Sequence, residues 1–242
     1  MIYDYIILGA GMAGLYCSYR LNKIGYNILC LEKNNFLGGR TKETCFHNTK
    51  IKLGAGVLDE SNIHLLRLLK ELKITPQMSD SFLVDKYLPS FDINVAINQI
   101  KNKYNSLSQP ILNTTVNQFL LTHFDKTFVK NFYFYADYTD FYDEDINDYI
   151  KHYPIDDIYR EKYKIGTISY TELANKLSIN INIKLLTPVI EIKNNNELFI
   201  VNNLYKSRKI ISCMTKDATE KLFSFDFLKQ IGSIPFCRNY IY

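Results

Sequence analysis

The chain has 242 residues, of which 47% are hydrophobic and 22% are charged, and its formal net charge is +4. These values are typical of a globular protein that buries about 70–75% of its unfolded surface. The lysines and arginines form no dense cluster, so a nucleic-acid partner is not expected. No apolar run approaches the length of a membrane span, and the N-terminus lacks the features of a signal peptide. We therefore expect no membrane partner and a cytoplasmic location.

The first 32 residues have the pattern of one βαβ unit. Residues 3–8 form a short apolar run that stops at Gly9, as buried parallel strands do. Residues 12–23 have helical spacing, and Gly25 follows where a left-handed residue commonly ends a helix. Residues 26–31 are again apolar and strand-like. The total length of about thirty residues suits a strand, a crossover helix and a second strand.

The turn before this helix has the sequence Gly9-Ala-Gly11-Met-Ala13-Gly14, a GxGxxG motif. Its place between a predicted strand and a predicted helix distinguishes it from a chance glycine-rich turn. Gly9 permits the tight turn, Gly11 lets the backbone approach a pyrophosphate, and Gly14 lets the helix pack close to the strand. Backbone N–H groups at the helix start, including that of Ala13, would face the phosphates. We therefore expect the ADP part of a dinucleotide to bind here.

Glu32 ends the second predicted strand, near the spacing of about 20 residues at which an acidic side chain binds the adenine-side ribose. Its carboxylate would accept hydrogen bonds from the ribose hydroxyls and would repel a 2′-phosphate. The alternative interpretation is a solvated carboxylate at the end of a strand.

A second glycine-rich segment, Gly38-Gly39-Arg40-Thr41, follows closely. We expect it to fold back over the same phosphates, with Arg40 in a charge-assisted contact with the pyrophosphate and the two glycines leaving room for it. An NAD dehydrogenase has no need for a second glycine–arginine element at this place. The segment therefore favours FAD over NAD.

This order of GxGxxG, acidic residue and GGRT resembles the flavin amine oxidase family, which includes monoamine, polyamine and L-amino-acid oxidases. The resemblance, carried chiefly by residues 3–73, implies that FAD is the cofactor. It also implies that Gly54, Ala55 and Gly56 belong to a segment that runs beneath the flavin. By the same resemblance, a strand over residues 183–192 carries Val189, which binds adenine through its backbone.

The complete sequence indicates an α/β fold, a Rossmann-like FAD/NAD(P)-binding domain with a mostly helical insertion. We expect residues 1–75 to form the first part of this domain, 76–160 a substrate-domain-like helical insertion, 161–225 the second part, and 226–242 the start of a substrate-domain segment. The expected helices are 62–73, capped by Asn62 or Ser61, then 92–104, 114–135, 143–151 and 170–178. The expected strands include a hairpin near 42–52, and then 183–192, 197–202 and 208–213.

No catalytic residue and no metal site are identified. The four histidines are scattered, and the five cysteines lack paired spacing, so we expect reduced structural thiols. The acidic cluster between Asp137 and Asp148 lacks the order of a calcium-binding loop and is interpreted as a solvated face. The aromatic run Phe132–Tyr138 is interpreted as core, with an aromatic cage for an amine as the alternative.

The resemblance implies an oxidoreductase that oxidises a C–N bond of an amine or amino acid by hydride transfer to flavin. The family's later substrate-domain strands and its C-terminal segment have no counterpart here. We therefore expect the C-terminal part of the family fold to be absent, the isolated chain to be inactive, and association with another chain. Two alternatives remain: a catalytically inactive relative that acts as a structural or interaction module, and an NAD-binding oxidoreductase.

Overall fold

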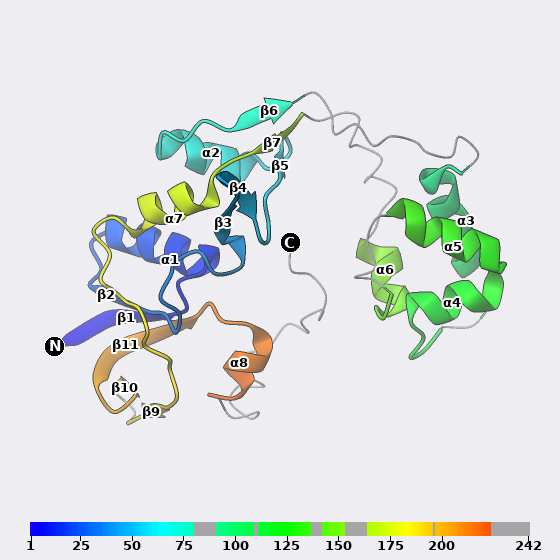
Figure 1. Cartoon of the computed structure of the whole chain (residues 1–242). Helices are drawn as coiled ribbons and strands as arrows, with labels where there is room; N and C mark the ends of the chain where they lie inside the picture. Colours follow the sequence, from blue (N-terminus) through cyan, green and yellow to red (C-terminus); the bar gives the residue numbers. More distant parts are fainter. Residues whose placement is uncertain (80–90, 109–110, 137–141, 153–163, 196, 224–242) are drawn as a thin grey trace. The chain divides into compact units, whose positions relative to one another are not determined.

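The computed structural model describes residues 1–79, 91–108, 111–136, 142–152, 164–195 and 197–223. The chain forms two compact units (Figure 1). The described part of the first consists of residues 1–78, 166–195 and 197–223, and the second lies within Ser79–Ile165. The substrate-domain segment expected over 226–242 lies outside the described residues.

A six-stranded sheet forms the centre of the first unit. In spatial order its strands are β8 (Ile183–Lys184), β2 (Ile28–Leu31), β1 (Ile2–Leu8), β11 (Tyr205–Ser212), β10 (Phe199–Val201) and β9 (Ile192–Asn194). β1 pairs in parallel with β2 and with β11, whereas β9, β10 and β11 form an antiparallel meander. Ile6, Ile7 and Leu8 of β1 are completely buried because apolar cores cover both faces of the sheet at this strand. The expected α/β fold is confirmed.

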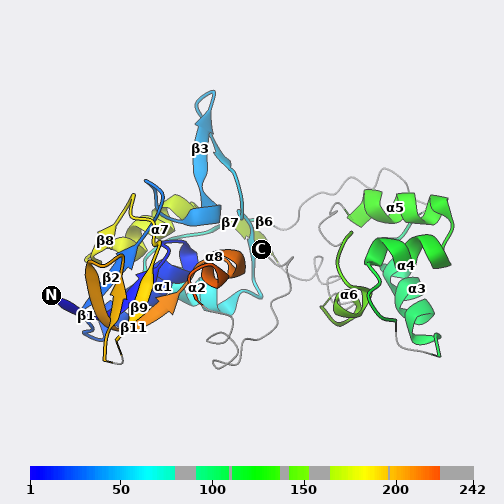
Figure 2. The same cartoon turned by 90° about the horizontal axis from the view of Figure 1, so that it is seen from below.

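Helices cover one face of this sheet (Figures 1 and 2). α1 (Met12–Lys23) is the crossover from β1 to β2, and it packs beside α7 (Tyr170–Ser178). Ile7 and Cys30 of the sheet form a core with Leu15 of α1, Leu173 of α7 and Leu69 of α2 (Ile63–Glu71). The alternate strand residues point to the opposite face and form a second core there.

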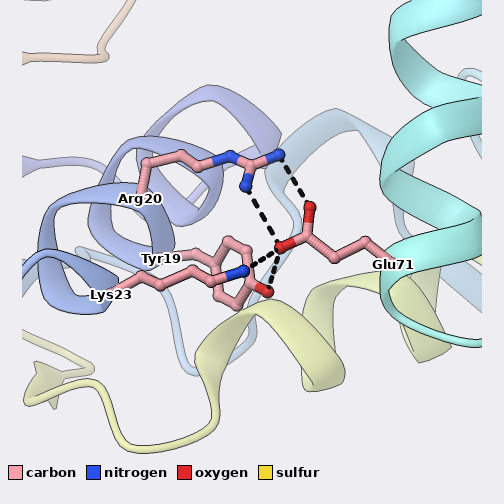
Figure 3. A network of polar contacts seen from close by, with 4 residues as sticks. All are labelled: Tyr19, Arg20, Lys23 and Glu71. Atoms are coloured by element: carbon pink, nitrogen blue, oxygen red, sulfur yellow. Dashed lines mark hydrogen bonds and ion pairs between the residues drawn. The ribbon is translucent and has the colours of Figure 1, made fainter.

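Glu71, at the end of α2, joins this helix to α1 (Figure 3). Its carboxylate accepts a hydrogen bond from the Tyr19 hydroxyl at 2.7 Å and forms ion pairs with Arg20 at 3.0 Å and Lys23 at 2.5 Å. Hydrogen bonds from the Lys23 ammonium and the Tyr19 hydroxyl lower the pKa of Glu71 from 4.5 to about 2. The network holds the C-terminal end of α1, which lies away from the glycine turn.

The remaining elements of the first unit are short. They are the 3₁₀ turn Gly39–Thr41, the hairpin of β3 (Glu43–Phe46) and β4 (Thr49–Lys52), a three-stranded sheet of β5 (Leu58–Asp59), β7 (Ile165–Thr167) and β6 (Gln77–Ser79), and α8 (Lys216–Glu220). The predicted hairpin and the helix over 170–178 are confirmed. α2 begins after Asn62 as expected, although the Asn62 side chain makes no capping hydrogen bond to the helix.

The prediction of one strand over 183–192 is wrong. β8 and β9 are separate strands, and residues 185–191 connect them without pairing in a sheet. Pro188 has no N–H to donate to a ladder, and Leu186 has a left-handed φ of 51°. Backbone groups of residues 188–191 bond to the Asn202 side chain instead of a neighbouring strand.

The described part of the second unit is helical, with α3 (Ile93–Asn105), α4 (Val116–His123), α5 (Lys126–Ala136) and α6 (Ile146–His152). It has a core of its own, in which Phe119, Phe132 and Tyr149 are almost completely buried. Of the aromatic run interpreted as core, Phe132 lies in this core, Phe134 is 60% exposed, and residues 137–138 lie outside the described residues.

The prediction of one helix over 114–135 is wrong. The chain becomes extended at Phe124, with φ of −131° and ψ of 155°, which ends α4. The carboxylate of Asp125 then accepts a hydrogen bond from the Phe128 N–H at 2.9 Å, so this residue caps α5. In the part of the chain that the structure describes, no helix has the length and apolar character needed to cross a bilayer.

Candidate dinucleotide-binding site

The turn between β1 and α1 depends on glycine at two positions. Gly9 has φ of 96°, a conformation that side chains disfavour, and its N–H donates to the Leu31 carbonyl oxygen at 2.8 Å. A Cβ on Gly14 would lie 1.8 Å from the carbonyl oxygen of Gly9. Only glycine therefore lets α1 pack this closely against the turn, which is the role that the motif predicts for Gly14.

Gly11 has a different environment. It precedes α1 with φ of −70°, and a Cβ there would meet no atom of the described residues within 4 Å. The fold itself therefore does not require glycine at this position. This open space leaves room for a pyrophosphate to approach the backbone, which is the role that the motif predicts for Gly11.

The first turn of α1 presents unpaired backbone donors. Gly11 offers no side-chain cap, and the N–H groups of Ala13 and Gly14 donate to no oxygen of the described residues. No acidic side chain lies in this turn. Free N–H groups at the positive end of a helix favour the binding of an anion such as phosphate.

Glu32 lies just beyond β2 and is only 6% exposed. One of its carboxylate oxygens accepts a hydrogen bond from the Ala10 N–H at 2.8 Å, and the other accepts one from the Asn34 N–H at 2.9 Å. Glu32 therefore supports the glycine turn directly, a role that the sequence motif did not reveal. Its burial excludes a solvated strand end. Each oxygen has a further lone pair, so the carboxylate retains capacity for ribose hydroxyls.

The second glycine segment lies against the first, as predicted. The Gly38 N–H donates to the Ala10 carbonyl oxygen at 2.9 Å. A Cβ on Gly39 would lie 3.2 Å from the Cα of Gly11. Gly38 and Gly39 have positive φ values of 93° and 59°, so glycine suits both positions.

Arg40 follows on the 3₁₀ turn, which the Thr41 hydroxyl closes by donating to the Gly38 carbonyl oxygen at 2.9 Å. The Arg40 side chain is exposed, and its guanidinium has no hydrogen-bond or ion-pair partner among the residues described. A free guanidinium next to two glycine turns suits a charge-assisted contact with an anion.

The segment expected beneath a flavin follows β4. A Cβ on Gly54 would lie 1.8 Å from the Arg40 carbonyl oxygen, so Gly54 packs against the backbone of the second glycine segment. The Gly56 carbonyl oxygen accepts hydrogen bonds from the Lys52 ammonium and the Thr167 hydroxyl, both at 2.9 Å. The described contacts of Gly56 thus run to β4 and β7 and not to the glycine turn. Ala55 lies between these two glycines.

Val189 lies on the segment that connects β8 with β9. Two backbone hydrogen bonds join the start of this segment to the residues that follow β2. The Thr187 N–H donates to the Glu32 carbonyl oxygen at 2.8 Å, and the Leu186 N–H donates to the Asn34 carbonyl oxygen at 3.0 Å. The Val189 side chain packs against the second core of the sheet. Its backbone N–H and C=O have no hydrogen-bond partner within the described ranges. Free backbone groups near Glu32 suit a ligand contact made by the main chain.

The cysteines near this site are packing residues. Burial raises the pKa of Cys30 to about 12 and that of Cys213 to about 11, so both remain thiols at neutral pH. Among the residues that the structure describes, no three or more His, Cys, Asp or Glu side chains gather in a way that could hold a metal ion. Asp137 and Asp140 of the acidic cluster lie outside those residues.

The first part of the chain is similar in sequence to known protein families. Residues 7–72 match the family described as NAD(P)-binding Rossmann-like domain. Amine oxidase [flavin-containing] B of Bos taurus is 35% identical over 72 residues, which cover 28% of this chain and 14% of that protein. A probable flavin-containing monoamine oxidase A of Dictyostelium discoideum is 30% identical over 73 residues, which cover 30% of this chain and 16% of that protein. The N-terminal region therefore has a Rossmann-like fold.

The resemblance of this Rossmann-like domain to flavin amine oxidases is thereby confirmed, and solved structures extend the likeness of fold. Cyclohexylamine oxidase from Brevibacterium oxydans superposes with a TM-score of 0.67 at 16% identity, over 92% of this chain and 60% of that chain. A putrescine oxidase variant redesigned in cofactor binding has a TM-score of 0.66 at 14% identity, with the same coverage.

The fold is not restricted to amine oxidases. A CLA-producing fatty acid isomerase from P. acnes superposes with a TM-score of 0.57 at 14% identity, over 90% of this chain and 63% of that chain. This chain spans about 60% of the solved oxidases, and the matched segment spans at most 16% of the curated relatives cited above.

Proposed function

We propose that this chain binds FAD and is part of a flavin-dependent oxidoreductase of the amine oxidase type. The observation that carries the proposal is the contact between the two glycine segments, in which the Gly38 N–H donates to the Ala10 carbonyl oxygen at 2.9 Å. A pyrophosphate bound at the first glycine turn would be covered by the second, with the Arg40 guanidinium beside it. A single glycine turn would suffice for NAD.

The other residues fit the parts of FAD on either side of the pyrophosphate. Glu32 would bind the adenine-side ribose, and the backbone of Val189 would bind adenine. Gly9, Gly11, Ala13 and Gly14 would face the pyrophosphate, since Gly11 leaves open space and the start of α1 leaves free N–H groups. Gly54, Ala55 and Gly56 would continue toward the flavin.

The substrate class follows from the sequence relatives, which are flavin-containing amine oxidases. We propose an amine or an amino acid whose C–N bond is oxidised. FAD, when bound, accepts the hydride, while the protein positions the substrate and excludes competing reactions. A fatty acid isomerase has a similar fold, so the fold alone does not determine the substrate. The assignment of an amine substrate therefore needs its own test.

The test is to purify the 242-residue chain and to record its visible absorbance. A flavin spectrum, together with FAD released on denaturation and identified by chromatography, supports the proposal. A colourless protein that binds NAD supports an NAD-binding oxidoreductase instead. A protein that binds neither dinucleotide supports a structural or interaction module.

A further inference from the structure

The turn between β10 and β11 contains an asparagine whose side chain acts outside the turn. Asn202 and Asn203 have left-handed φ values of 52° and 55°, and the Leu204 N–H donates to the Val201 carbonyl oxygen at 3.0 Å. A turn with left-handed φ at both of its central residues accepts asparagine or glycine at these positions. The turn alone therefore does not require the Asn202 side chain.

All the side-chain hydrogen bonds of Asn202 go to the segment that connects β8 with β9. Its Oδ1 accepts from the Ile190 N–H at 2.9 Å and from the Glu191 N–H at 3.3 Å, and its Nδ2 donates to the Pro188 carbonyl oxygen at 2.8 Å. The Asn202 N–H also donates to the Glu191 carbonyl oxygen at 2.9 Å. One residue thus satisfies backbone groups on both sides of Val189.

Residues 185–191 do not pair in a sheet, so these hydrogen bonds of Asn202 take the place of strand pairing in holding the segment. The near end of the segment is held at β2 by the bonds of Leu186 and Thr187 to Asn34 and Glu32. Asn202 holds the far end. Between the two attachments, the N–H and C=O of Val189 are left without partners among the described residues.

We infer that Asn202 is a positioning residue for the adenine end of the FAD site, because it holds the Pro188–Glu191 segment with the backbone of Val189 free to meet the base. The inference rests on the proposed function. Asn202 does not touch FAD itself; it acts through Val189. It thereby couples the β10–β11 turn, which is remote in sequence from both glycine segments, to the recognition of adenine.

The variant Asn202→Gly removes the side chain and keeps the left-handed backbone. The matched control is Asn203→Gly in the same turn, because the Asn203 side chain bonds to Lys193 and Glu191 side chains and not to the backbone of residues 188–191. The probes are FAD and FMN, because FMN has the flavin but lacks the adenosine part. The measurement is the dissociation constant of each probe by fluorescence titration.

We expect Asn202→Gly to bind FAD about tenfold more weakly, because three hydrogen bonds that hold the segment are lost. Its affinity for FMN should stay unchanged, and Asn203→Gly should bind both probes like wild type. Asn202→Asp keeps the oxygen that accepts from Ile190 and Glu191, so its FAD affinity should lie between those of wild type and Asn202→Gly. A parallel loss of FAD and FMN affinity, or unchanged FAD binding by Asn202→Gly, would overturn the inference.

Amide hydrogen exchange of the wild-type protein tests the same point without a variant. The Val189 amide should exchange more slowly when FAD is added, whereas the Ile190 amide is already bonded to Asn202. An unchanged Val189 amide in the FAD complex would refute the positioning role while leaving FAD binding intact. Failure of wild type to bind FAD would instead refute the proposed function.

Discussion

At the scale of single residues, Glu32 links the stability of the glycine turn to the nucleotide that the turn is proposed to bind. Its carboxylate is buried and accepts backbone hydrogen bonds from Ala10 and Asn34. Removal of the carboxylate therefore has two effects. The proposed ribose contact would lose its charged acceptor, and the backbone N–H groups of Ala10 and Asn34 would lose theirs.

We expect Glu32→Ala to weaken FAD binding about ten- to hundredfold, because hydrogen bonds to a charged group contribute about 1.5–3 kcal/mol. It should also lower the free energy of unfolding by about 1–3 kcal/mol through the unpaired N–H groups. FAD titration and urea unfolding measure the two effects. The control is Glu71→Ala, which removes a carboxylate at the other end of α1 and should leave FAD affinity unchanged. Wild-type affinity in Glu32→Ala would remove Glu32 from the site.

Variants of Gly11 and Gly14 distinguish an effect on ligand binding from an effect on folding. A side chain at Gly11 meets open space, so we expect Gly11→Val to fold and to lose FAD binding more completely than Glu32→Ala does. Gly14→Ala should instead destabilise the protein, because its Cβ would overlap the Gly9 carbonyl oxygen at 1.8 Å. Thermal unfolding and FAD titration of both variants check this contrast. FAD binding by Gly11→Val at wild-type strength would contradict the placement of the pyrophosphate.

At the scale of elements, α1 is held firmly at one end and left open at the other. Glu71 of α2 binds Tyr19, Arg20 and Lys23 near its C-terminal end (Figure 3). Its N-terminal turn presents free N–H groups and no acidic side chain. The fixed end stabilises the element, and the open end is available for an anion.

The network of Glu71 predicts a defined acid sensitivity. Its pKa is lowered from 4.5 to about 2 in the folded protein, chiefly by the Lys23 ammonium and then by the Tyr19 hydroxyl. The stabilisation is therefore fully present above about pH 4.5 and is lost as the pH falls toward 2. We expect wild type to be more stable than Glu71→Gln at pH 6, with a difference that shrinks across this window. Urea unfolding at several pH values measures it, and a difference independent of pH would contradict the ion-pair explanation.

The helix α5 allows a matched test of the second core. Phe132 is 1% exposed and packs among the residues of that core, whereas Phe134 of the same helix is 60% exposed. We expect Phe132→Ala to lower the free energy of unfolding of the helical unit by about 3–5 kcal/mol. Phe134→Ala should change it by less than about 0.5 kcal/mol. Urea unfolding followed by circular dichroism compares the two, and equal losses would show that this core is packed differently.

At the scale of the whole molecule, all the residues proposed to bind FAD belong to the first unit, and the helical unit contributes none of them. The first unit therefore contains the whole of the proposed nucleotide site. Oxidation of an amine needs more, because the reacting carbon must be held close to the flavin, and a misplacement of about 1 Å costs about a hundredfold in rate.

We expect the 242-residue chain to bind FAD and yet to produce no peroxide above background from polyamines, monoamines or L-amino acids. It spans about 60% of the solved oxidases that share its fold, and we propose that association with another chain completes the substrate site. A peroxide assay with added FAD is the measurement. Rescue of turnover by a second, separately expressed chain would support this association, and efficient turnover by the 242-residue chain alone would contradict it.

Local patterns predicted the parts of the fold that depend on neighbouring residues. The apolar run before Gly9, the helical spacing after it and the spacing to Glu32 established one βαβ unit with a glycine turn. The helix over 170–178 was predicted to the residue, because its polar cap and apolar periodicity are both local. The contact between the two glycine segments was also expected, because the order of GxGxxG, Glu32 and GGRT resembles that of flavin amine oxidases.

The features that depend on hydrogen bonds between distant parts of the chain could be seen only in the tertiary structure. Residues 183–192 look like one strand because they are rich in apolar and β-branched residues. In the folded chain, however, the Asn202 side chain bonds to backbone groups of Pro188, Ile190 and Glu191, and residues 185–191 do not pair in the sheet. The support that Glu32 gives to Ala10 likewise joins residues 22 positions apart. The sequence by itself therefore determined the dinucleotide-binding unit, since periodicity and turn chemistry are local properties. The surroundings of its adenine end were decided only in the folded chain, because a side chain that satisfies a distant backbone leaves no periodic signal.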